Sequence, residues 1–121
     1  MAVKAVRQGE IVEVSCNIPH GGCKVHMVLV VSDEELLEKE EGMFYGVMIT
    51  SKNHNPEYTL EITPDMLIRP LSKTSYFATH LMSFYTLDEV GKSCRTALKE
   101  EYFDKVVNKV IKSIFNVNIA D

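Results

Sequence analysis

The sequence predicts one small, mainly β domain that ends in an amphipathic helix. With 121 residues, the chain is long enough for one hydrophobic core, whereas each half would be too small to hold its own. Several short segments alternate polar and apolar side chains or are rich in β-branched residues, and both patterns are typical of strands. The last segment repeats apolar residues every three or four positions, as a helix with one buried face does. We therefore expect a single domain over residues 1–121.

Two segments carry the strand pattern most clearly. Residues 9–15 alternate polar and apolar side chains, which is the period of a strand with one buried face. Residues 25–31 form an almost wholly apolar, β-branched run, which predicts a strand buried on both sides. The other segments expected to be strands are 43–50, 57–62, 74–79 and 84–87.

Turn residues and a helix signal lie between these strands. Residues 16–24 contain Asn, Pro and two Gly, a composition that predicts a loop. Ser32 and Glu35 have the spacing of a capping box, so a short helix is expected to begin at Ser32. Gly42 is expected to lie just after that helix, because glycine tolerates a positive φ.

The C-terminal helix is expected to span residues 98–115. Its acidic residues come early and its lysines late, an order that suits the helix dipole. Five or six short strands followed by one long helix predict a strongly bent sheet or small barrel that the helix covers.

Composition excludes several classes of protein. The longest apolar run, Met27–Val31, has five residues, whereas a membrane-spanning helix needs about 20. The first residues lack the apolar stretch of a secretory signal, so we expect a cytoplasmic protein with no membrane partner. Three cysteines without framework spacing fit a reducing compartment. The formal net charge of −4 argues against bulk electrostatic coating of nucleic acid but leaves room for a local basic site.

Three segments carry recognisable motifs in order along the chain. Arg7–Val12 is similar to an opening R-G-E/D-I strand, and His26–Ser32 to R-P-V-L-V-I-S after a Gly-containing loop. Gly46–Ser51 is similar to a short apolar strand that ends in T-S. Together with Ser75–Phe77, Thr86–Asp88, Val90–Gly91 and the terminal helix, they cover nearly the whole chain. In this pattern the chain resembles the MazF/PemK family, the toxin half of many bacterial toxin–antitoxin pairs.

The resemblance implies a fold, an activity and partners. The implied fold is a small SH3-like barrel with a C-terminal helix, an architecture shared by the MazF/PemK and CcdB toxins. The implied activity is cleavage of single-stranded RNA without a metal or other cofactor. The implied partners are a second copy of the chain, as a homodimer, and a cognate antitoxin whose disordered acidic tail lies across the RNA groove.

The resemblance also implies a site. The family places an arginine at the start of the second strand and a threonine or serine at the end of the third. Thr50 retains the second, but His26 stands where the family has arginine. A histidine is a better proton shuttle than an arginine, since imidazole titrates near pH 6.5, so His26 and Thr50 are the expected catalytic residues. The residues expected to bind RNA or phosphate are Lys24, Ser51, Lys52, Arg69 and His80.

Three alternatives stay open at this stage. Without the family's arginine, the barrel is a catalytically degenerate module that binds RNA or a protein. A second alternative is a toxin that inhibits a protein target such as DNA gyrase. The third concerns a metal: Cys16, His20, Cys23 and His26 are potential zinc ligands, although their spacing matches none of the common zinc motifs.

Overall fold

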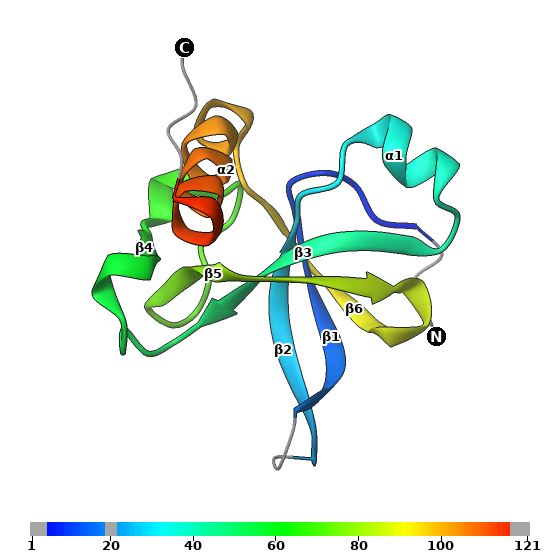
Figure 1. Cartoon of the computed structure of the whole chain (residues 1–121), viewed down its shortest axis with the longest axis horizontal. Coiled ribbons are helices and arrows are strands. Elements are labelled where there is room, and N and C mark those ends of the chain that lie inside the picture. The colour runs from blue at the N-terminus through cyan, green and yellow to red at the C-terminus, as the bar shows by residue number, and fades with distance from the viewer. Residues whose placement is uncertain (1–4, 19–21, 117–121) are drawn as a thin grey trace.

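The computed structural model describes residues 5–18 and 22–116, and side chains from residue 5 to 15 and from 24 to 116. Six strands and two α-helices make up this part of the chain (Figure 1). Their bounds are β1 (Glu10–Ile18), β2 (Gly22–Val30), α1 (Glu34–Lys39), β3 (Met43–Thr50), β4 (Thr59–Ile62), β5 (Ser75–Thr86), β6 (Val90–Ala97) and α2 (Glu100–Phe115).

All six strands belong to one antiparallel sheet in the order β4-β5-β3-β2-β1-β6. The sheet is strongly bent, and its two end strands, β4 and β6, are not hydrogen-bonded to each other. Helix α2 lies at the β4–β5 end, whereas α1 lies at the opposite end (Figure 1). A mainly β, barrel-like fold with a C-terminal helix is therefore confirmed.

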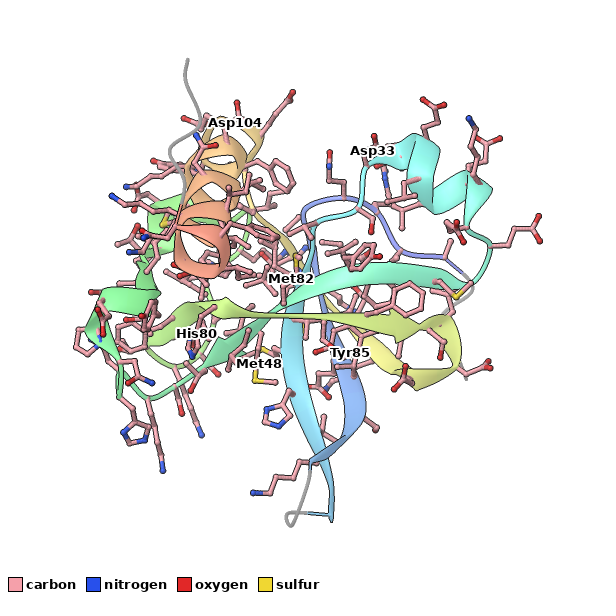
Figure 2. The ribbon with its side chains drawn as sticks, viewed as in Figure 1. Asp33, Met48, His80, Met82, Tyr85 and Asp104 are labelled. Carbon is pink, nitrogen blue, oxygen red and sulfur yellow. The ribbon has the colours of Figure 1, made fainter. Side chains whose placement is uncertain are left out.

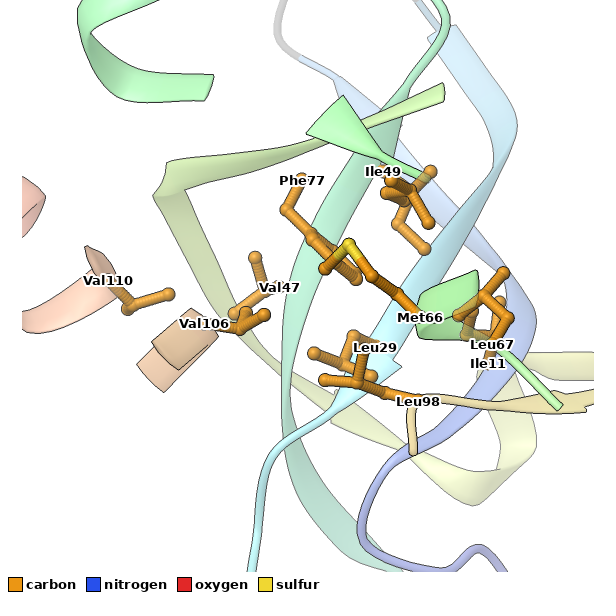
Figure 3. Close-up of a cluster of buried hydrophobic side chains, with 11 residues drawn as sticks. Ile11, Leu29, Val47, Ile49, Met66, Leu67, Phe77, Leu98, Val106 and Val110 are labelled. Atoms are coloured by element: carbon orange, nitrogen blue, oxygen red, sulfur yellow. The ribbon is translucent and has the colours of Figure 1, made fainter. Parts of the chain in front are cut away.

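Two hydrophobic clusters cover the two faces of the central strands. One contains Leu29 and Val47 and continues under α2 to Val106 (Figure 3). The other contains Val28 and Val30, whose side chains leave β2 on the opposite face. All three of these central β2 residues have no exposed surface, so burial on both sides is confirmed for this part of the strand, whereas Val25 is 62% exposed.

The loop predicted over residues 16–24 is wrong at both ends. Cys16 pairs with Lys24, and Ile18 pairs with Gly22, so β1 and β2 continue through most of that segment. The register runs without a shift from Ile11↔Leu29 to this end of the hairpin. Continuous backbone pairing therefore outweighs the turn-forming composition, and residues 19–21 lie outside the described part of the chain.

The expected cap of the short helix is also wrong. Asp33, not Ser32, is the N-cap residue: its carboxylate accepts from the Leu36 N–H at 2.7 Å. Ser32 is buried and accepts from the Tyr45 N–H at 2.8 Å, so its hydroxyl connects the helix entry to β3 instead. Gly42 does adopt a positive φ of 80°, two residues beyond the C-cap.

The second half of the sheet differs from the prediction in two ways. The segments 74–79 and 84–87 are parts of one strand, β5, whose pairing with β3 shifts register between Val47 and Ile49. Strand β6 was not predicted. Two register shifts against β1 interrupt the alternation of inward and outward side chains along β6. The sequence of this strand therefore lacks a period of two.

Helix α2 begins two residues later than predicted, because Leu98 forms a bridge with Leu67. Its start is held by the Tyr102 hydroxyl, which donates to Asp65 at 2.8 Å. Hydrogen bonds from Thr63 and then from Tyr102 lower the pKa of Asp65 from its ordinary value. No helix in the described part of the chain is long and apolar enough to cross a membrane.

Candidate functional site

A cavity of about 390 Å³ lies where the β2–β3 pairing stops. The last paired residues are Met27 and Ile49, so the next residues outward are His26, in the middle of β2, and Thr50, the last residue of β3. Both residues line the cavity, as do Ser51 and Lys52 after β3. Four of the predicted site residues are thus brought to one place by the register of a single strand pair.

His26 lies on β2 opposite Val14 of β1 and is half-buried. Its Nε2 atom is buried and has no hydrogen-bond partner in the described structure. A buried polar atom without a partner is uncommon and costs free energy, and a bound ligand is one way of satisfying it. His26 therefore lines the cavity and also has a buried ring nitrogen without a partner.

The end of β3 supplies hydroxyls and a cation. Thr50 pairs with Tyr76 of β5, and its Oγ1 accepts from the Lys52 N–H at 3.1 Å. This local hydrogen bond turns the chain away from the strand and fixes the Thr50 side chain at the cavity. Ser51 and Lys52 are exposed, so the hydroxyl and the ammonium group remain accessible.

The sequence did not identify Glu13 or Lys73, which also line the cavity. Glu13 faces Met27 across the β1–β2 pair, and its carboxylate lies 3.7 Å from the Lys92 ammonium group. Lys73 precedes β5, where its carbonyl accepts from the Ser75 hydroxyl at 3.0 Å. The β1–β2 pairing brings Glu13 to this cavity and the segment before β5 brings Lys73, and no motif in the sequence indicates either.

The cavity does not include three of the residues predicted to bind RNA or phosphate. Lys24 is exposed farther out on the β1–β2 hairpin, opposite Cys16. Arg69 is exposed, and its backbone exchanges two hydrogen bonds with the Thr96 hydroxyl. His80 lies on β5, with its ring centroid 5.0 Å from that of Tyr58 (Figure 2). Their roles remain predictions.

The zinc hypothesis is not decided. His20 and the side chains of Cys16 and Cys23 lie outside the described residues, which leaves only His26 of the four potential ligands. Among the residues that the structure describes, no group of three or more His, Cys, Asp or Glu side chains is arranged to hold a metal ion.

The groups around the cavity suit an anionic, phosphorus-centred reaction. His26 and Glu13 can exchange protons, hydroxyls come from Thr50 and Ser51, and ammonium groups come from the two lysines. Burial, followed by the Glu13 carboxylate, raises the pKa of the nearby Cys94 thiol from its ordinary value.

Comparisons with known proteins identify the family and the fold. Residues 7–114 match the family described as PemK-like, MazF-like toxin of type II toxin–antitoxin system. One similar solved structure is an endoribonuclease in complex with its cognate antitoxin from a mycobacterial species; identity is 14%, the TM-score is 0.71, and 96% of this chain and 100% of that chain are covered. A second, an endoribonuclease from a mycobacterial species, has the same identity and TM-score and 96% coverage of both chains.

A third similar structure, the Mycobacterium tuberculosis toxin MazF-mt6, shares 11% identity at a TM-score of 0.67, with 91% of this chain and 99% of that chain covered. Comparison with curated proteins finds no match. At such low identities the solved structures establish the fold, while the family match extends over nearly the whole chain. The chain belongs to the PemK-like, MazF-like toxins of type II toxin–antitoxin systems.

Proposed function

We propose that this toxin is an endoribonuclease that cleaves single-stranded RNA without a metal ion. The observation that carries the proposal is the cavity at the β2–β3 end, whose lining residues include a histidine, a glutamate, two lysines and four residues with hydroxyls. The endoribonuclease descriptions of two similar structures support the same activity.

Metal-free cleavage uses the RNA's own 2′-hydroxyl as the nucleophile. The 2′-oxygen attacks the adjacent phosphorus, the bond from phosphorus to the 5′-oxygen breaks, and a 2′,3′-cyclic phosphate is left. One group must take the 2′-hydroxyl proton and another must give a proton to the 5′-oxygen. His26 fills one of these roles. The other falls to a different group at the cavity, because Glu13 pairs with Met27 and so leaves the sheet on the face opposite to His26.

Charge on the phosphorane requires donors. The Thr50 hydroxyl is held at the cavity by its hydrogen bond to the Lys52 N–H, so it is already placed before substrate binds. Lys52 and Lys73 supply the fixed positive charge that the family's arginine would give. In this way the roles of one arginine are divided between His26 and two lysines.

We expect purified protein to cut members of a varied single-stranded RNA pool in excess EDTA. The products should carry 2′,3′-cyclic phosphate, and the rate should change with pH in the range where imidazoles titrate. Sequencing of the product ends checks both the cleavage and its chemistry. A protein that binds single strands but cuts none of the pool is the degenerate binding module, and one that acts only on gyrase is a toxin of the other class.

We further propose that the active form is a homodimer with C2 symmetry, located in the cytoplasm and neutralised by a cognate antitoxin through a disordered acidic tail. A cleft on so small a domain is shallow, and pairing two copies deepens it. Support comes from neighbouring β3 and β5, where Tyr45, Met82 and Phe84 are 42%, 38% and 47% exposed.

Light scattering at micromolar concentration should give about twice the 13.7 kDa chain mass. The physical reason is burial of the apolar side chains of β3 and β5. Phe84→Glu should lower the measured mass towards one chain, because a carboxylate would then be buried in the contact. A wild-type mass of one chain throughout the concentration range would contradict the dimer.

A further inference from the structure

A second cavity continues the candidate site across the sheet. Its volume is about 630 Å³, and it shares Glu13, Leu71 and Ser72 with the first cavity. Strand β1 lies between β2 and β6 in the sheet, so a path from the β2–β3 end across β1 arrives at β6 (Figure 1). The two cavities are therefore adjacent and share one wall, and together they are called the groove.

The β6 end of this groove is built on a bulge. Ile11 pairs with Thr96 but Val12 pairs with Ser93, so Cys94 and Arg95 are extra residues on the β6 side. Arg95 has a φ of 58°, a left-handed conformation that is unfavourable for a non-glycine residue, and its N–H donates to the Ser93 hydroxyl at 3.1 Å. Strain of this kind is concentrated at functional sites.

Positive charge is concentrated in the groove. Its charged lining residues are four cations, Lys52, Lys73, Lys92 and Arg95, and one carboxylate, Glu13, whereas the whole chain has a formal net charge of −4. Lys92 is paired with Glu13, but Arg95 forms no ion pair with any described residue. The exposed Arg95 guanidinium is thus free for an outside anion.

Other cavities have the opposite character. The cavity beside α1, of about 420 Å³, is lined by three glutamates, and the cavity between α1 and α2 is lined by three carboxylates. Neither contains a lysine or arginine. A polyanion is therefore attracted along the groove and repelled from these two surfaces.

We propose that the β6 end of the groove binds a phosphate flanking the scissile one on the same RNA strand, with Arg95 as the contacting residue. The proposal rests on the function proposed above and adds a second contact point beyond the cleavage site. A guanidinium matches phosphate geometry in two parallel hydrogen bonds, and Arg95 is an exposed residue of the bulge. Pro70 and Leu71 line the same end and offer apolar surface to a base.

The test compares Arg95→Asn with Arg7→Asn, which removes the same charge from an exposed site lining neither cavity. Asparagine tolerates positive φ, so Arg95→Asn should fold. Binding is measured by fluorescence anisotropy at several salt concentrations, with a twelve-nucleotide single strand that carries 2′-O-methyl groups and cannot be cleaved. A binding readout keeps this proposal separate from cleavage.

For Arg95→Asn we expect about fivefold weaker binding at 0.1 M salt and a salt slope that is shallower by about 0.7, the loss of one phosphate contact with a single strand. Arg95→Lys should restore the salt slope, because it keeps the charge, but only part of the affinity, because an ammonium group cannot make two parallel hydrogen bonds. With a cleavable RNA of the same length, KM should rise while kcat stays unchanged, and cleavage of a dinucleotide, whose only phosphate is the scissile one, should be unaffected. Equal binding and equal slopes for Arg95→Asn and Arg7→Asn would overturn the proposal, even if the protein cleaves RNA.

Arg95→Gly separates binding from folding. Glycine adopts positive φ without strain, so the melting temperature of this variant should be equal to or higher than that of the wild type. Weaker RNA binding in such a stable variant supports the proposal. Wild-type affinity in this variant would show that Arg95 contributes no contact, whatever the outcome of the cleavage assay.

Discussion

Replacing His26 with alanine is expected to lower the rate of RNA cleavage by about 100-fold or more, since positioned proton transfer contributes at least that much in enzymes. The melting temperature should barely move or should rise. The Nε2 atom of His26 is buried without a partner, so the substitution removes an unsatisfied polar atom rather than a stabilising contact. Single-turnover cleavage rates and thermal melts of the same preparations check both expectations.

His26→Arg and His26→Gln are the matched variants for this prediction. Arginine restores the residue that the family has at this position but does not exchange protons at neutral pH. If His26 shuttles protons, neither variant should show the wild type's pH dependence. A His26→Arg protein that cleaves faster than wild type would show instead that the position serves only to supply positive charge, with proton transfer performed elsewhere in the cavity.

Strand positions were predictable because the spacing of apolar residues along the sequence indicates which side chains are buried. The expected strands at 25–31 and 43–50 correspond to β2 and β3 within a few residues, and the helix expected at 98–115 corresponds to α2. Periodicity does not show where strands pair through residues whose composition is typical of a loop. The polar, glycine-containing ends of the β1–β2 hairpin are held by backbone hydrogen bonds, which any residue except proline can donate.

The candidate site was predictable only in part, for a related reason. His26 and Thr50 stand at fixed positions in two recognisable motifs, and the neighbouring strands bring them together. Glu13 and Arg95 reach the groove through the β1–β2 register and through a bulge in β6, respectively. No local sequence pattern predicts either the register or the bulge. Side chains that arrive by long-range pairing are therefore the ones that the sequence does not reveal.

Phe77→Ala is expected to destabilise the fold by about 3–5 kcal/mol, the usual range for removing a fully buried phenylalanine. Phe77 has no exposed surface and lies between two strand pairs, opposite Ile49 of β3 and opposite Leu60 of β4. Truncation would leave a cavity in the cluster under α2, at the position that holds β4 to the rest of the sheet. Urea unfolding at one protein concentration measures the change.

Phe115→Ala is the control for this prediction, because it makes the same chemical change at a residue that is 63% exposed at the end of α2. We expect it to cost less than about 1 kcal/mol. Ile49 both contacts the Phe77 cluster and lines the cavity beside Thr50, so Phe77→Ala should also slow cleavage at temperatures where the protein is still folded. Similar losses of stability in the two variants would contradict the assignment of Phe77 to the core that supports the site.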